Sequence, residues 1–297
     1  MAINISVAGY GNLGKQLVGQ IRSDNRFKLK YVFSRRNIDL PERRNFTQAN
    51  ELAEESDVLA LALGSYDDIE KKLKYFSRYD TIDCFDTHDK IDKYKQLLEE
   101  MKPETFSLFA AGWDPGLLSL SRGLFNALGV SATLWGKGQS MGHSNAIRSV
   151  DGVLDAVQFT CPVAKAESLF ADGETNTNKL IKRVCYVAAV ESDKENIKRQ
   201  ILEMPYYFKD YQTEVNFVEK SDVARLRKDM SHRGKVLGRG NGWQGETSLV
   251  ISDNAAFTAK IMLCCGSAAI KCKKDGYKGA FSLFDLPLRY LVDENCL

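Results

Sequence analysis

A glycine-rich segment near the start of the chain has the spacing that binds the phosphates of a dinucleotide. It consists of Gly9, Tyr10, Gly11, Asn12, Leu13 and Gly14 and fits the pattern GxGxxG. The first glycine of this pattern makes a tight turn, the second lets the backbone approach the pyrophosphate, and the third lets helix and strand pack closely. The N–H groups at the start of the following helix then face the phosphates. The pattern alone is a weak signal, but a predicted strand before it and a predicted helix after it favour dinucleotide binding.

Two arginines follow the second predicted strand, where the ribose of such a cofactor is usually recognised. The strand ends at Phe33, and Ser34, Arg35 and Arg36 come next. An NAD-binding chain usually has Asp or Glu here for the ribose 2′-hydroxyl, whereas a hydroxyl and two guanidinium groups suit the 2′-phosphate of NADP. Two solvated arginines after a strand are the alternative. Their position downstream of the glycine motif favours NADP as the cofactor.

Polar residues also follow the next three predicted strands. Gly64 and Ser65 follow the third, and they are either contacts of the cofactor or an ordinary turn. Asp86 follows the fourth strand and Asp114 the fifth. Ligands of open α/β sheets bind beyond the carboxyl ends of the strands, so two carboxylates there would favour a substrate with an ammonium group and accept its proton before hydride transfer. The alternative for each aspartate is that it caps the next helix.

The second half of the chain carries candidate anion binders. Arg183 lies within an apolar predicted strand, and His232 lies in a predicted loop rich in Gly and Arg. A lone Arg in a strand is more often a surface residue, and a lone His is more often structural. Trp113 and Trp135 are expected to be core residues or walls of a pocket, because large aromatic side chains are usually buried.

The elements that must position these residues follow two kinds of pattern. Short apolar strands first alternate with amphipathic helices, which predicts a Rossmann-type, doubly wound parallel sheet. Its strands are expected at residues 3–8, 29–33, 58–63, 81–85 and 106–111, with helices at 12–23, 91–102 and 117–128. Later strands are longer and alternate with polar faces, which predicts an α+β domain with a mainly antiparallel sheet. These strands are expected at residues 156–160, 184–190, 214–218 and 246–252, with helices at 194–204 and 254–273.

These patterns predict three regions. They are a NADP-binding Rossmann domain at residues 1–116, a substrate-binding α+β domain at residues 117–252, and a C-terminal segment at residues 253–297 that packs on the first domain.

Composition excludes several classes of protein. The chain has 297 residues and a formal net charge of +2, which attracts neither nucleic acid nor a membrane surface by itself. No run of eighteen apolar residues occurs and the N-terminus enters a strand at once, so we expect no membrane span and no signal peptide. The 7 cysteines include no CxxC pair and the 3 histidines lack ligand spacing. We therefore expect no metal site, and reduced thiols in the cytoplasm.

Several segments of the sequence resemble the meso-diaminopimelate D-dehydrogenase family. They are residues 7–14, 33–36, 112–116, 135–136, 142–144, 156–160, 182–183, 204–205, 214–217 and 279–281. The likeness covers nearly the whole chain. The segment GWDPG at 112–116 and the combination of WG at 135–136 with GHS at 142–144 are specific to this family, whereas the glycine motif is not.

The resemblance implies a reaction and its partners. Members oxidatively deaminate the D-centre of meso-2,6-diaminopimelate with NADP, and the product L-2-amino-6-oxopimelate cyclises to tetrahydrodipicolinate. The reverse direction consumes ammonia and supplies lysine and peptidoglycan precursors in bacteria. The resemblance also implies a homodimer formed through the second domain, no metal, and closure of the two domains on binding.

Matched position by position, Asp86 and Asp114 correspond to the carboxylates that hold the reacting amine. Trp113, within GWDPG, and Trp135 correspond to the substrate pocket, and the backbone of Met141 and Gly142 corresponds to a stretch that contacts the substrate. The polar groups that hold the distal L-centre correspond to Thr160, Arg183, His232 and Asn254.

The sequence departs from the family pattern at a few positions. Met141 stands in place of Gln, residues 232–235 read His-Arg-Gly-Lys in place of His-Gly-Gly-His, and two alanines follow Asn254 in place of Pro and Asp. Another NADP-dependent amino-acid or aldehyde dehydrogenase is one alternative. A catalytically inactive NADP-binding regulatory protein is another, although the chain keeps both aspartates, Arg183 and His232.

We predict that replacing both Arg35 and Arg36 with Ala weakens NADP binding much more than NAD binding. The guanidinium groups are expected to contact the 2′-phosphate, which NAD lacks. Titration of each cofactor against the wild type and the double variant measures the effect. An equal loss for both cofactors would show that the pair does not recognise the 2′-phosphate.

Overall fold

The computed structural model describes residues 2–65, 68–229 and 231–292, and the chain divides into two compact units. Unit 1 comprises Met1–Leu120 and Ala255–Leu297, and unit 2 is the continuous segment Ser121–Asn254 between them. Unit 1 is therefore assembled from both ends of the chain.

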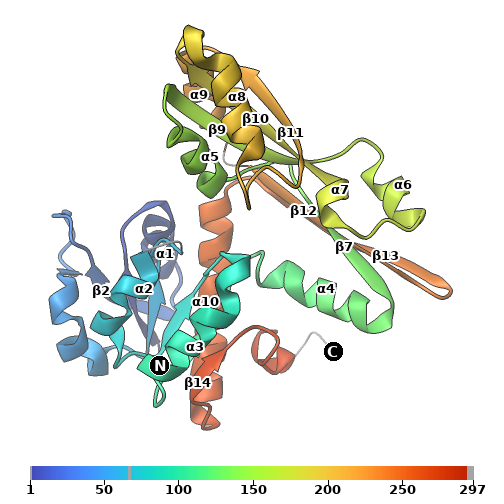
Figure 1. Ribbon diagram of the computed structural model, residues 1–297. Helices are drawn as coiled ribbons and strands as arrows, with labels where there is room; N and C mark the ends of the chain where they lie inside the picture. The colour runs from blue at the N-terminus through green and yellow to red at the C-terminus, as the bar shows by residue number, and fades with distance from the viewer. Residues whose placement is uncertain (1, 66–67, 230, 293–297) are drawn as a thin grey trace. The chain divides into compact units, whose positions relative to one another are not determined.

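Unit 1 contains a seven-stranded sheet in the order β14-β6-β5-β4-β1-β2-β3 (Figure 1). The strands are β1 (Ile3–Ala8), β2 (Phe27–Phe33), β3 (Arg43–Arg44), β4 (Val58–Leu61), β5 (Thr81–Asp83), β6 (Phe106–Leu108) and β14 (Gly279–Phe281). Every neighbouring pair is parallel. The predicted parallel sheet is thus confirmed, and the two edge strands β3 and β14 extend it beyond the five predicted strands.

Helices cover both faces of this sheet. The helices of unit 1 are α1 (Asn12–Ser23), α2 (Asp68–Lys72), α3 (Ile91–Met101) and α10 (Asn254–Lys274), with short 3-10 helices η1 (Phe46–Glu55), η2 (Leu73–Phe76), η3 (His88–Lys90) and η5 (Leu288–Tyr290). One core cluster joins the sheet to Leu17 of α1 and Met262 of α10. The other joins it to Phe46 of η1 and Tyr94 of α3. Buried residues on both faces explain why the strand sequences are continuously apolar.

By length and composition alone, helix α10 could cross a membrane, although its sequence contains no uninterrupted run of eighteen apolar residues. Half of its apolar window is buried. Its buried residues, including Met262, Cys265 and Ala269, belong to the core cluster of unit 1. At Gly266 an added Cβ would lie 3.4 Å from Ile82 and 3.9 Å from Ile5, so the helix backbone runs close over the sheet. These contacts are those of a core helix.

Unit 2 contains two sheets (Figure 1), with the strand orders β11-β10-β9-β8 and β13-β12-β7. The strands are β7 (Val130–Trp135), β8 (Gly138–Gln139), β9 (Val153–Pro162), β10 (Ile181–Ala189), β11 (Gln212–Phe217), β12 (His232–Gly240) and β13 (Trp243–Ile251). All pairs are antiparallel except β10 with β11. The predicted α+β unit with mainly antiparallel pairing is confirmed.

The helices of unit 2 are short, and the longest apart from α4 is α8 with 10 residues. They are α5 (Met141–Arg148), α6 (Ala166–Ala171), α7 (Thr177–Leu180), η4 (Glu191–Asp193), α8 (Lys194–Glu203) and α9 (Lys220–Leu226), and α4 (Leu117–Leu128) connects the two units in sequence. Ile147 of α5 and Ile197 of α8 pack in one cluster with β9 and β10. Val223 of α9 packs with Val157 and Phe159 in another cluster.

The prediction that His232 lies in a loop is wrong, because residues 232–240 form the central strand of the three-stranded sheet. Gly234, Gly238 and Gly240 make the segment resemble a loop in the sequence. Two of them are required by close packing: an added Cβ would lie 2.5 Å from Phe125 at Gly238 and 2.3 Å from Trp243 at Gly240. Here glycine therefore marks side chains that lie directly on the backbone of a strand.

Candidate active site

The three glycines of the GxGxxG motif differ in the space around them. Gly9 has φ +100°, and an added Cβ would lie 2.3 Å from the carbonyl oxygen of Ala62. At Gly14 an added Cβ would lie 2.1 Å from the carbonyl oxygen of Gly9, whereas at Gly11 no atom of the described residues would lie within 4 Å of it. Gly9 and Gly14 are therefore required by packing within the protein. Gly11 is left open, as expected for the glycine that faces a pyrophosphate.

The open glycine also begins helix α1. Gly11 is its N-cap and provides no side-chain cap, so the first N–H groups of the helix are available to a ligand. Of the other motif residues, Asn12 is exposed, while Tyr10 and Leu13 are half-buried against the core. The backbone of this segment thus presents donors, and the side chains anchor it.

The residues after β2 contact the glycine motif directly. Ser34 is buried, and its Oγ accepts a hydrogen bond from the backbone N–H of Arg36 at 3.1 Å. The guanidinium of Arg36 donates to the carbonyl oxygen of Tyr10 at 2.7 Å. Arg35 is exposed and lies 4.0 Å from Asp68. The predicted ribose-recognition residues and the predicted phosphate loop therefore form one site within unit 1.

A cavity of about 330 Å³ extends from Arg35 toward a group of lysines. Its lining residues are Arg35, Asn45, Phe46, Thr47, Asp68, Lys71, Lys72, Lys74 and Tyr75. Its acidic residue, Asp68, is paired with Lys72 at 2.5 Å, and this lysine lowers the pKa of the carboxyl group. The surplus of cationic groups fits the 2′-phosphate of NADP. The lysines at 71, 72 and 74 were not singled out from the sequence.

The two predicted strand-end aspartates both lie in unit 1, after neighbouring strands. Asp86 is exposed, and its backbone N–H donates to Oγ of Ser65 at 3.2 Å, so the turn after β4 holds the segment after β5. Asp86 is not a helix N-cap, because Thr87 is the N-cap of η3 and Lys90 is the N-cap of α3. Gly64 precedes α2, and its carbonyl oxygen accepts hydrogen bonds from the first turn of that helix. Ser65 is thus a structural link to the candidate catalytic segment.

Asp114 lies in the GWDPG segment that precedes α4. It is half-buried, and its Oδ1 accepts a hydrogen bond from Ser119 Oγ at 3.4 Å. Trp113, beside it, is also half-buried. The carbonyl oxygen of Trp113 accepts the N–H of Leu118 at 2.8 Å, so the segment is fixed to the first turn of α4.

In unit 2 the structure brings Arg183, Thr160 and His232 together. Arg183 is only 8% exposed, lies opposite Thr160 in the ladder of β9 and β10, and donates to its hydroxyl. His232 Nε2 lies 3.0 Å from the carbonyl oxygen of Gln139, and its ring packs on Gly138, which pairs with Thr160. Burial lowers the pKa of Arg183, whose charge is partly offset by the ring of Tyr211 at 4.1 Å. This arrangement is a buried cationic site.

Met141 and Gly142 form the first turn of α5, directly after β8. Ser140 is the N-cap and accepts the N–H of His143, while no atom in the described part of the chain lies within 4 Å of the position of a Cβ at Gly142. The side chain of Met141 is 52% exposed. The backbone N–H groups at the start of this helix are suited to a carboxylate.

The remaining predicted substrate residues lie at the ends of elements. Trp135 is the last residue of β7, is half-buried, and has the guanidinium of Arg122 5.8 Å from its ring centroid. Asn254 is the first residue of α10 and is half-buried. The predicted substrate residues therefore fall in two groups, one in each unit.

Two polar residues of the cationic site were not predicted. Gln158 is completely buried and its Oε1 has no hydrogen-bond partner among the described residues; the same is true of Nε of Arg183 and Nε2 of His143. Burial, together with the charge of Arg183, lowers the pKa of His143 to about 3, so this imidazole is neutral. Buried polar atoms without partners are rare, and they are expected where a ligand supplies the missing bonds. His143 belongs to the GHS segment, which could have drawn attention to it.

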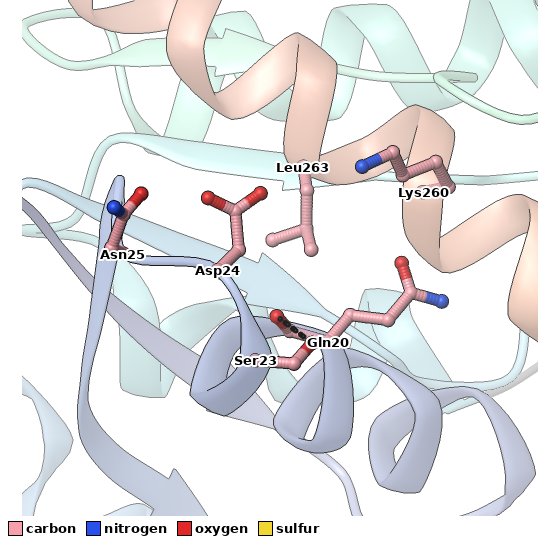
Figure 2. A pocket seen from close by; sticks show the side chains of 6 residues that line it. All are labelled: Gln20, Ser23, Asp24, Asn25, Lys260 and Leu263. Carbon is pink, nitrogen blue, oxygen red and sulfur yellow. Dashed lines mark hydrogen bonds between the residues drawn. The ribbon is translucent and has the colours of Figure 1, made fainter.

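Another cavity of unit 1 contains none of the predicted site residues. It has a volume of about 440 Å³ and is lined by Gln20, Ser23, Asp24, Asn25, Lys260 and Leu263 (Figure 2). It lies at the end of α1 that is remote from the glycine motif. Among the described residues no group of acidic, His and Cys side chains could hold a metal ion.

A Rossmann-type sheet with a NADP-type phosphate site, followed by an α+β unit, defines the class of two-domain NADP-dependent oxidoreductases. Residues 112–253 match the sequence model of the diaminopimelic acid dehydrogenase C-terminal domain. The meso-diaminopimelate D-dehydrogenase of Acetivibrio thermocellus is 37% identical, with 97% of this chain and 94% of the relative covered. That of Corynebacterium glutamicum is 34% identical, with 99% and 96% covered.

Solved structures agree with these relatives. The C. glutamicum DAP dehydrogenase in complex with DAP has a TM-score of 0.89 at 33% identity and covers 99% of this chain and 96% of its own. An engineered D-amino acid dehydrogenase bound to NADP+ has a TM-score of 0.84 at 31% identity and covers 100% and 98%. The chain belongs to the meso-diaminopimelate D-dehydrogenase family, which confirms the resemblance found in the sequence.

We predict that Gly11→Ala folds normally but binds NADP at least about tenfold more weakly, equivalent to 1.4 kcal/mol. Its φ of −85° suits Ala, and no atom of residues 2–65, 68–229 or 231–292 lies near the added Cβ, which would instead meet the pyrophosphate. Gly14→Ala is the contrasting variant, because its Cβ would overlap the backbone of Gly9 and should destabilise the protein by about 1–3 kcal/mol or more. Thermal unfolding without cofactor and NADP titration separate the two effects. Normal NADP binding by Gly11→Ala would contradict this assignment of the loop.

Proposed function

We propose that this chain catalyses the NADP-dependent oxidative deamination of the D-centre of meso-2,6-diaminopimelate to L-2-amino-6-oxopimelate and ammonia, and the reverse reaction. The observation that carries the proposal is Arg183, a buried guanidinium with an unpaired Nε, within a chain that aligns along its length with dehydrogenases of this substrate. A buried cation with an open donor requires an anionic partner. The substrate has a carboxylate at the end that does not react.

In this proposal the two ends of the substrate are held by groups of opposite charge. Arg183, Thr160, His232 and Asn254 hold the distal L-centre, with the guanidinium on its carboxylate. Asp86 and Asp114 hold the ammonium group of the D-centre, and one of them accepts the proton that leaves nitrogen before the hydride is transferred. The N–H groups of Met141 and Gly142 bind the near carboxylate, and Trp113 and Trp135 exclude water.

The bound NADP+ accepts the hydride from the D-centre carbon. The protein holds this cofactor through the backbone of residues 9–14, Ser34, Arg35 and Arg36, and the turn at Gly64 and Ser65. After hydride transfer, water replaces nitrogen at the oxidised carbon and ammonium leaves, so that the organic product is a ketone. The homodimer and the cytoplasmic location expected from the sequence belong to the same proposal.

The stereoisomers of diaminopimelate test the reaction itself. We expect NADPH formation with the meso isomer and none with the LL isomer, which has no D-centre. The DD isomer should react more slowly than the meso isomer, because its far end has the wrong handedness for the distal site. Equal rates with the meso and LL isomers, or no turnover of the meso isomer, would refute the proposed function.

Arg183→Ala tests the distal site. A hydrogen bond to a charged group contributes about 1.5–3 kcal/mol, so kcat/KM for meso-diaminopimelate should fall about tenfold to a hundredfold or more. The loss should be much smaller with a simple D-amino acid that lacks the distal carboxylate. Lys182→Ala is the matched control, because it removes a neighbouring positive charge from the same strand. The ammonium of Lys182 donates to Glu214. Equal losses on both substrates would mean that Arg183 supports the fold and does not bind the far end.

A further inference from the structure

A buried carboxylate lies between the two segments that carry the candidate catalytic aspartates. Asp83 is the last residue of β5 and is 1% exposed. Its Oδ1 accepts the backbone N–H of Phe85 at 2.9 Å and that of Ala110 at 3.3 Å. One oxygen atom therefore joins the segment that leads to Asp86 with the segment that leads to Asp114.

The backbone of the same residue adds a third link. The N–H of Ala111 donates to the carbonyl oxygen of Asp83 at 2.7 Å. Ala110, one of the two residues bound by Asp83 in this segment, has φ +52°, a conformation that residues other than glycine rarely adopt. Such a conformation persists where the surroundings hold it, and here the side chain and the backbone of Asp83 bind Ala110 and its neighbour.

The second carboxylate oxygen is fixed from helix α3. Oδ2 accepts the hydroxyl of Tyr94 at 2.8 Å, and Tyr94 is completely buried. The tyrosine ring stacks on that of Phe85, with ring centroids 4.2 Å apart. It is nearly perpendicular to the ring of Phe109, with centroids 6.4 Å apart. The helix thus contacts both segments through a single side chain, which also orients the carboxylate.

The charge of Asp83 has no direct ion-pair partner among the described residues. The charge of Lys102 lowers the pKa of Asp83, but its ammonium donates to Thr81 and Ser107 instead. Burial raises the pKa of Asp83 to about 6, so the group is ionised at neutral pH and able only to accept. A buried carboxylate costs stability, and the three donors that surround it offset this cost only in part.

We propose that Asp83 is a positioning residue, whose carboxylate fixes the segments after β5 and β6 so that Asp86 and Asp114 are held in a constant relation. The inference rests on the proposed function for the roles of those two aspartates. Its geometric part, the linking of residues 84–88 to residues 110–116, does not depend on the reaction.

Three variants test this role. Asp83→Asn keeps the shape and the Oδ1 acceptor but places a donor toward Tyr94, and Tyr94→Phe removes one bond to the carboxylate. Tyr79→Phe is the matched control. Tyr79 is a buried tyrosine of the same core cluster, but its hydroxyl donates to the carbonyl oxygen of Ala49 at 3.0 Å.

Amide hydrogen exchange of the cofactor-free protein gives a measurement that is independent of activity. Asp83→Asn and Tyr94→Phe should raise exchange at least severalfold in residues 84–88 and 110–116, and Tyr79→Phe should not. Unchanged exchange in both segments would overturn the proposal. If Asp83→Asn does not fold, Tyr94→Phe decides the question alone.

Kinetics then test the consequence for catalysis. With meso-diaminopimelate, Asp83→Asn should lower kcat about tenfold or more while the Kd for NADP stays within twofold, and Tyr79→Phe should leave both unchanged. In an Asp86→Asn background the further loss caused by Asp83→Asn should be clearly smaller than in the wild type, because part of the effect of Asp83 acts through Asp86. If Asp83→Asn lowered kcat by the same factor in the Asp86→Asn background as in the wild type, or by no more than Tyr79→Phe does, Asp83 would only stabilise the fold and would not position Asp86. A wild type that does not oxidise the meso isomer would refute the proposed function, while the exchange result would still judge the linking role.

Discussion

The common direction of the seven strands in unit 1 is the constraint on which the chemistry depends. Because every pair is parallel, the ends of β1, β2, β4, β5 and β6 lie at one edge, and the residues after them are brought together. Hydrogen bonds then join these segments pairwise: Arg36 to Tyr10, Ala62 to Ala8, Asp86 to Ser65, and Ala110 to Asp83. The candidate cofactor loop and the candidate catalytic aspartates are thus parts of one connected strand-end network.

The two units place their candidate ligand-binding charges differently with respect to solvent. Unit 1 leaves its carboxylate Asp86 and its guanidinium Arg35 exposed, where water screens them until a ligand arrives. Unit 2 instead buries Arg183, between Thr160 and the ring of Tyr211, with a donor left unpaired. A buried cation without an anionic partner lowers the free energy of unfolding. Unit 2 is therefore expected to be less stable without a bound anion than with one. The neutral His143 beside Arg183 adds polarity without adding a second charge.

The sequence predicted the fold class, and it predicted most accurately the elements with a long and regular pattern. Residues 3–8, 12–23 and 117–128 have the predicted bounds, because a strand-to-helix transition or an amphipathic period marks both ends. It missed β8, which has two residues, and β12, whose glycines accommodate aromatic rings. In the candidate site, the NADP loop and Arg183 followed from residue type and context. The roles suggested for Asp83 and Gln158 did not, since they depend on burial and on partners far along the chain, which periodicity does not reveal.

The assembly of unit 1 from both ends of the chain bears on how the protein is made. Unit 2 is one continuous segment and can complete its core as soon as it has left the ribosome, while unit 1 still lacks α10 and β14. Until residues 255–281 emerge, the apolar face that Met262 and Ala269 cover stays open and β6 remains an unpaired edge. A nascent or prematurely terminated chain that stops near residue 254 therefore exposes both an apolar sheet face and a strand edge, which are the features that recruit chaperones or lead to aggregation. Of the two units, the one with the candidate cofactor loop therefore begins to be translated before unit 2 and is completed after it.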